Sequence, residues 1–183
     1  MLWGPPLLAV QVRSEGGATR LQARFPYGVE TELATRRREI IAPRAFASRI
    51  DAGEDIHLLF GHDFTKPLAS RAAGSLELRD TDMVLMIEAE IDTGTSWAHD
   101  FMVAHRAGLI TGLSPGFRVP PGGEKIERRG NELVRTVTQA ELFELSAVTR
   151  PAYSSAQIEA RAWQPVGEVA QRVAERHAAL RWR

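Results

Sequence analysis

The sequence predicts a mainly β fold with helices, in which an antiparallel barrel or sandwich is covered by a few packed helices. Short apolar runs bounded by turn residues recur along the chain, as is typical of strands. Only a few segments have helical periodicity, and they do not alternate with strands as in a parallel βαβ sheet. At 183 residues, the chain is long enough to bury a core as a single domain.

In the first part of the chain we expect a strand over 7–12, a turn over 14–17, a strand over 19–25, a strand ending at Pro43, and a short helix over 44–50. Proline suits the first helical turn, where its missing N–H would have no partner. The next run, IHLLFGHD, predicts a compact apolar strand whose end carries His62, followed by a loop.

GSLELRD and MVLMIEAEID predict a hairpin around residues 80–82. Alternate positions of the second arm share one apolar face: Met83, Leu85, Ile87, Ala89 and Ile91. Because the opposite face is also partly apolar, we expect this arm to be a central strand.

GTSWAHDFMVAHRAG predicts a helix that Thr95 or Ser96 can cap and that Gly108 can end. After it we expect a strand over 110–119, an exposed hairpin over 120–132, and a long β-rich run over 133–149. The tail has the periodicity of an amphipathic, basic helix. We therefore expect a β domain over residues 1–160 and a C-terminal helix over 161–183.

Composition narrows the classes of function. The balance of 23 basic and 23 acidic residues gives no net field that would recruit nucleic acid or an anionic membrane. The absence of cysteine excludes thiolate catalysis and disulfide frameworks. The apolar start is broken by Pro5 and Pro6 and is too short to span a bilayer, so we expect a cytoplasmic protein. No metal-ligand spacing or phosphate-binding loop is present, and we expect no cofactor.

Ser114 stands in the segment GLSPG, between Gly112 and Gly116. Small neighbours and a constrained backbone can present a serine hydroxyl as a nucleophile, although such serines are also common turn formers. A nucleophilic serine needs a base, and the chain has five histidines: His57, His62, His99, His105 and His177. His62 differs from the others because it ends an apolar strand, where its side chain would emerge at the rim of a sheet. A structural role for it stays open at this point.

Four segments, in this order, carry a family resemblance: EIIAPRAF, LLFGHD, GLITGLSPGF and ELSAVTRPAY. From about Leu21 to Ala156 the chain resembles the prohead maturation proteases of tailed phages. This resemblance implies a serine protease with a fold similar to the herpesvirus assemblins, an antiparallel β-barrel surrounded by helices. It also implies that Ser114 is the nucleophile and His62 the general base.

The third catalytic residue has two candidates, Glu144 and Glu141, since a carboxylate can hold the imidazole in the required tautomer. Three positions apart on a regular strand, the two point to opposite faces, so at most one faces the site. The family motif favours Glu144, with Glu141 as the alternative; either could also be a solvent-exposed carboxylate. By analogy with assemblins, the oxyanion hole involves Thr149 and Arg150.

Three residues depart from the family pattern: Arg44 replaces a glycine, Gly61 replaces an asparagine, and Pro115 follows the serine where an aliphatic residue is common. The resemblance implies an endopeptidase that cleaves scaffold and major capsid protein segments inside the assembling procapsid, in the host cytoplasm. The basic tail would serve in targeting, self-association or packing on the β domain. The alternative is a catalytically degenerate protease fold that acts as a non-enzymatic assembly module.

Overall fold

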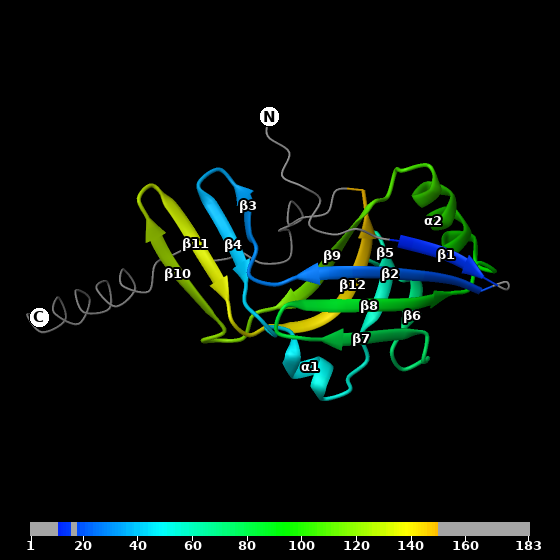
Figure 1. Ribbon diagram of the computed structural model, residues 1–183, viewed down its shortest axis with the longest axis horizontal. Helices are drawn as coiled ribbons and strands as arrows, with labels where there is room; N and C mark the ends of the chain where they lie inside the picture. The colour runs from blue at the N-terminus through cyan, green and yellow to red at the C-terminus, as the bar shows by residue number, and fades with distance from the viewer. Residues whose placement is uncertain (1–10, 16–17, 150–183) are drawn as a thin grey trace, which may run out of the picture.

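The structure is a computed structural model that describes residues 11–15 and 18–149 (Figure 1). In this part of the chain it contains twelve strands and two helices, so the prediction of a mainly β fold is confirmed. The strands form three four-stranded sheets, and seven of the nine strand pairings are antiparallel. Among these strands no closed barrel is found, so the barrel expected from the resemblance is not confirmed.

The first sheet has the order β1-β2-β8-β7, with β1 at Gln11–Glu15, β2 at Ala18–Pro26, β7 at Leu76–Asp80 and β8 at Val84–Ile91. The predicted hairpin of β7 and β8 is present, and β8 is a central strand as expected. Its inward face is buried from Leu85 to Ile91 at every second residue. Met83 does not join that face, because it lies in the turn before β8 and is 78% exposed.

The second sheet has the order β10-β11-β4-β3, with β3 at Glu30–Ala34, β4 at Arg37–Ile41, β10 at Glu124–Arg129 and β11 at Glu132–Val137. A hairpin is present, but β10 and β11 form it over residues 124–137 and not over the expected 120–132. It lies in a sheet, since β11 pairs in parallel with β4. The expected β-rich run over 133–149 is two strands in different sheets. Residues Thr138, Gln139 and Ala140 separate them.

The third sheet has the order β6-β5-β12-β9, with β5 at His57–Phe60, β6 at Asp63–Ser70, β9 at Gly112–Arg118 and β12 at Glu141–Val148. The sequence predicted a loop where β6 lies. Pro67 argued against a strand here, because proline has no N–H to donate to a neighbouring strand. β6 is at the edge of its sheet and pairs with one strand only, so proline is tolerated in it.

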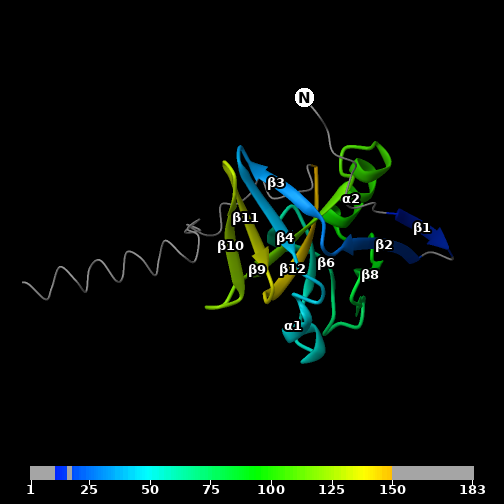
Figure 2. The ribbon, with the colours of Figure 1, turned by 60° about the vertical axis from the view of Figure 1, so that its left-hand side comes forward.

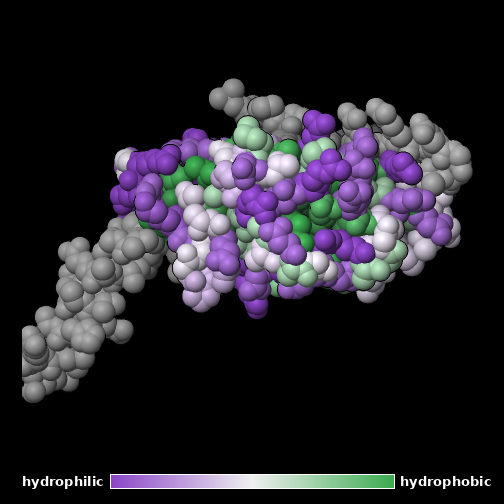
Figure 3. Space-filling model, turned by 60° about the horizontal axis from the view of Figure 1, so that its bottom comes forward, coloured by the Kyte–Doolittle hydropathy of each residue, from purple (hydrophilic) through white to green (hydrophobic). Residues whose placement is uncertain are grey.

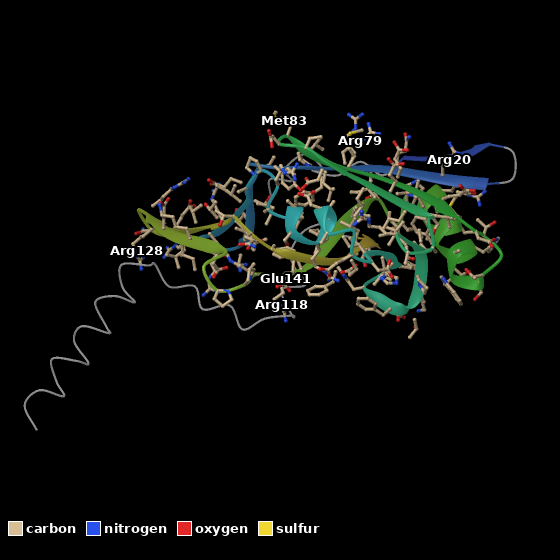
Figure 4. The ribbon with its side chains drawn as sticks, turned by 90° about the horizontal axis from the view of Figure 1, so that it is seen from below. Arg20, Arg79, Met83, Arg118, Arg128 and Glu141 are labelled. Carbon is tan, nitrogen blue, oxygen red and sulfur yellow. The ribbon has the colours of Figure 1, made fainter. Side chains whose placement is uncertain are left out.

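The core lies between the first and third sheets, whose strands are seen as two layers in Figure 4. Buried residues from both sheets form one apolar cluster, among them Leu21, Ile87, Leu58, Leu113 and Leu145. Because side chains alternate along a strand, the neighbours of Leu113 and Leu145 point away from this core. Ser114, Glu144 and Ser146 therefore belong to the opposite face of the third sheet.

Two helices complete the described chain. Helix α1, at Ala47–Asp51, packs against β12 and β7, and helix α2, at Ser96–Arg106, packs against β5 and β6 (Figures 1 and 2). Thr95 caps α2 by accepting a hydrogen bond from Ala98 N, and Gly108 follows its end with a φ of +72°, as the sequence predicted. Neither helix is long and apolar enough to cross a membrane.

Hydrophilic residues cover most of the surface seen in Figure 3, with smaller apolar areas between them. Of the strand expected over 7–12, residues 11 and 12 belong to β1, whereas residues 7–10 lie outside the described residues. The C-terminal helix expected over 161–183 and the boundary at residue 160 also lie outside them.

Candidate active site

His62 lies in a tight turn between two strands. β5 ends at Phe60 and β6 begins at Asp63, so Gly61 and His62 alone form the connection. Their φ angles are +66° and +62°. Positive φ at both central residues is what a type I′ hairpin turn requires, and glycine meets that requirement without strain whereas histidine does so at a cost. The turn puts the imidazole at the end of the hairpin, beside β12.

Glu144 holds the imidazole. The Nδ1 atom of His62 lies 2.7 Å from the Oε1 atom of Glu144, whose side chain is only 4% exposed. In neutral histidine the ring nitrogen that faces a carboxylate carries the proton, so Nδ1–H donates and Nε2 becomes the acceptor. This tautomer is the one that a general base acting through Nε2 needs.

The same contact affects the titration of the ring. The hydrogen bond to Glu144 raises the pKa of His62 above its ordinary value of 6.5, and the attraction between the two charges adds to this effect. Burial of the imidazole opposes it. The net direction is upward because the carboxylate favours the imidazolium more than desolvation disfavours it.

The other ring nitrogen is placed differently. His62 Nε2 is buried and has no hydrogen-bond partner among the described residues. A buried polar atom without a partner is uncommon in folded proteins and is frequently found at functional sites. A base whose accepting atom is sheltered and unoccupied is able to take a proton from a neighbouring hydroxyl.

Ser114 lies on the same face as this pair. In the antiparallel pairing of β9 and β12, Ser114 is directly opposite Ser146, and Gly116 is opposite Glu144. Side chains of directly opposed residues lie on one face, with Cβ atoms about 4.5–5.5 Å apart. Ser114 is 6% exposed. Among the described residues, no hydrogen bond joins its hydroxyl to His62, and such bonds are frequently long until substrate is bound.

Pro115 does not interrupt the strand that carries Ser114. β9 is at the edge of the third sheet, so it has a ladder on one side only. Proline is tolerated where its missing N–H would face away from the neighbouring strand. Pro115, one of the three departures from the family pattern, is therefore compatible with a regular strand pairing, in which it lies opposite Leu145.

Glu141 lies apart from His62. Its carboxylate pairs with Arg118, at 2.6 Å from one guanidinium nitrogen, and Figure 4 shows these two residues side by side. The expectation that Glu141 and Glu144 face opposite sides is wrong, because a bulge between Leu142 and Glu144 adds one residue to the strand. Both Leu142 and Leu145 therefore face the core, and both glutamates point away from it.

The remaining predicted residues are scattered. Thr149 follows the last residue of β12 and is exposed, and Arg150 lies outside the described residues. His57 begins β5 and lies 3.4 Å from Asp55. His105, on α2, contacts the carbonyl oxygen of Ile110. His99 is exposed on the same helix, and His177 is not among the described residues.

Sequence reasoning gave no role to Ser146. Its hydroxyl donates to Glu144 Oε2 at 2.5 Å and accepts from the backbone N–H of His62 at 2.9 Å. A signal was available, because a residue two positions after Glu144 on a strand shares its face. The hydrogen bond from the His62 backbone to Ser146 could not be predicted from strand periodicity, since His62 lies in a turn that is distant in sequence from Ser146.

A serine, a histidine and a buried carboxylate gathered on one face of a β-sheet are the residues from which serine hydrolases build their catalytic sites. A family model described as caudovirus prohead serine protease matches residues 12–169. The chain therefore belongs to this family of tailed-phage proteases, as the four sequence segments indicated. No curated protein and no solved structure matches the chain.

Proposed function

We propose that this chain is an active serine endopeptidase in which Ser114 is the nucleophile, His62 the general base and Glu144 the residue that orients the base. The observation that carries the proposal is the hydrogen bond between Glu144 and His62 Nδ1, which leaves the buried Nε2 atom without a partner among the described residues. Family membership supports peptide bonds as the target.

In the proposed reaction, the Ser114 oxygen attacks the carbonyl carbon of the scissile peptide bond while His62 Nε2 takes the serine proton. Glu144 stays ionised and stabilises the imidazolium that forms. The tetrahedral intermediate then expels the amine, which receives the proton from His62. Water, deprotonated by His62 in turn, attacks the resulting ester and releases Ser114.

The assignment favours Ser114 over Ser146, the other serine on this face. Ser146 is completely buried, and its single hydroxyl proton is directed to Glu144 Oε2. It is therefore bound on the carboxylate side of the imidazole, where it has no proton to give to Nε2. Ser114 is the serine in the neighbouring strand that retains some exposure.

For the oxyanion we propose the segment that follows β12, where Thr149 lies and Arg150 comes next. Stabilisation of a tetrahedral intermediate requires N–H donors about 2.7–3.1 Å from the developing oxyanion. Thr149 is near the end of the strand that carries Glu144 and Ser146, and this location supports the segment as a candidate.

The proposed substrates are segments of the scaffold and of the major capsid protein, cleaved inside the assembling procapsid in the host cytoplasm. Membership of the prohead protease family supports this class of substrate. A role of the basic tail in targeting or self-association stays a prediction.

The test is a cleavage assay with the cognate scaffold and capsid proteins. Wild-type protein is expected to produce defined fragments by mass spectrometry, whereas Ser114→Ala and His62→Ala produce none. Ser75→Ala serves as a control, since its hydroxyl bonds only to the Ser70 backbone among the described residues. Equal cleavage by wild type and Ser114→Ala would contradict the assignment, and binding without cleavage by the wild type would favour the non-enzymatic assembly role.

A further inference from the structure

We propose that Ser146 is a positioning residue whose hydroxyl locks the Glu144 carboxylate to the backbone of the His62 turn. This inference rests on the proposed function, because it gives Ser146 a part in the same site. Ser146 would not touch substrate. It would act through the two residues that it joins.

The hydroxyl of Ser146 acts both as a hydrogen-bond donor and as an acceptor. The oxygen donates its proton to Glu144 Oε2 at 2.5 Å, within the range of hydrogen bonds between a hydroxyl and an ionised carboxylate. It accepts the backbone N–H of His62 at 2.9 Å. The side chain is 0% exposed, so water cannot replace either bond without a change in the structure.

The first bond orients the carboxylate. Glu144 has three rotatable side-chain bonds, and one hydrogen bond to His62 would leave the carboxylate able to swing. With Oε2 held by Ser146 and Oε1 by His62 Nδ1, both oxygens are occupied and the plane of the carboxylate is defined. A carboxylate bound at both oxygens keeps the imidazole in one tautomer and one direction.

The second bond stabilises an unfavourable backbone. His62 has a φ of +62°, a conformation that residues other than glycine adopt at a cost. The bond to Ser146 compensates part of that cost by satisfying the His62 N–H, while the neighbouring Gly61 N–H donates to Ala147 O at 3.1 Å. The Ser146 hydroxyl therefore links Glu144 to the backbone of His62, in addition to the direct bond between the Glu144 carboxylate and the imidazole.

The activity experiment compares Ser146→Ala and Ser146→Thr with the wild type. Ser146→Ala is expected to lower kcat by about 10- to 100-fold with KM nearly unchanged, because a bond to a buried charged group is lost. Ser146→Thr keeps the hydroxyl and is expected to recover most of kcat. Ser75→Ala, which removes a partly buried serine hydroxyl outside the site, should stay within about twofold of the wild type. Ser146→Ala with wild-type kcat, or Ser146→Thr as impaired as Ser146→Ala, would overturn the inference.

A second measurement does not depend on proteolysis. In a Ser114→Ala background, amide hydrogen exchange of His62 is compared with that of Gly61, whose hydrogen bond does not involve the Ser146 hydroxyl. Ser146→Ala should speed exchange at His62 by about tenfold or more relative to Gly61. An unchanged ratio would overturn the inference even in an active protease. A changed ratio in a chain that cleaves nothing would support the bond network while contradicting the proposed function.

Discussion

Gly116 lies directly across from Glu144, and the space that its missing side chain would fill is occupied by the glutamate. A Cβ atom built at Gly116 would lie 2.7 Å from Glu144 Cδ and 2.9 Å from Cγ, and it would overlap the carboxylate. Because Gly116 has no side chain, the Glu144 side chain can lie against it while its carboxylate bonds to His62. Close approach is the reason for glycine here, since its φ is not positive.

Gly116→Ala is expected to displace the Glu144 carboxylate and break its bond to His62. We expect kcat/KM to fall by about 10²- to 10⁴-fold, the range for a misplaced acid–base group. Gly94→Ala is the control, because Gly94 also lacks a positive φ and lies in an exposed loop. Steady-state kinetics on both variants make the comparison, and a Gly116→Ala variant as active as Gly94→Ala would contradict the account of this contact.

The two glutamates can be separated by matched substitutions. Glu144→Gln should lower kcat by about 10³- to 10⁴-fold, because an amide does not stabilise the imidazolium or enforce its tautomer. Glu141→Gln should leave kcat within about twofold, since its carboxylate pairs with the exposed Arg118. Both variants are assayed on one substrate. A larger loss in Glu141→Gln than in Glu144→Gln would reverse the assignment.

The raised pKa of His62 predicts how activity depends on pH. The base must be neutral, so kcat/KM should rise with pH through a midpoint above 6.5. Glu144→Gln removes the leading cause of the rise in pKa, and its midpoint should move to lower pH. A pH profile of both proteins tests this, and an unmoved midpoint would show that another group controls the profile.

The contribution of His62 to the free energy of unfolding should decrease with pH, whereas activity should increase with pH. A folded-state pKa above the unfolded value means that the His62–Glu144 pair stabilises the fold fully below about pH 6.5. This contribution is lost as the pH rises through the folded-state pKa of His62. Denaturant unfolding should therefore show the destabilisation caused by His62→Ala shrinking as the solution becomes alkaline. A difference that grows with pH would mean that His62 is neutral in the folded protein throughout.

Arg44 occupies a backbone conformation that favours glycine. Its φ is +55°, and its side chain makes an exposed ion pair with Asp51 at 2.6 Å. Both Arg44→Gly and Arg44→Ala lose that pair, but only glycine relieves the backbone. We expect Arg44→Gly to be about 1 kcal/mol more stable than Arg44→Ala in denaturant unfolding. Equal stability of the two variants would mean that Arg44 is not strained.

Much of the fold follows from periodicity and turn residues alone. The apolar residues on both faces of β8 predicted a central strand, and Thr95 and Gly108 predicted the ends of α2. β3 was not predicted because its residues are mostly polar and none of them is buried. β6 was not predicted because it contains Pro67 and several exposed residues. Edge strands gain stability from one neighbour only, so their sequences follow the pattern less strictly.

Only part of the candidate site could be predicted from the sequence. The family resemblance pointed to Ser114, His62 and Glu144, and their catalytic roles remain predictions. The bulge that turns Glu141 and Glu144 to one side could not be foreseen, because it depends on pairing with β9. The same holds for the bond from Ser146 to the His62 backbone, which joins residues 84 positions apart.

Covalent labelling with a fluorophosphonate tests the central claim most directly. An activated serine oxygen displaces fluoride at phosphorus, so the adduct marks the nucleophile without need of the natural substrate. We predict one adduct, located on Ser114 by peptide mass mapping, that does not form in His62→Ala. An adduct on Ser146 or elsewhere, or labelling of Ser114→Ala at the wild-type rate, would contradict the assignment of Ser114 as the nucleophile that His62 activates.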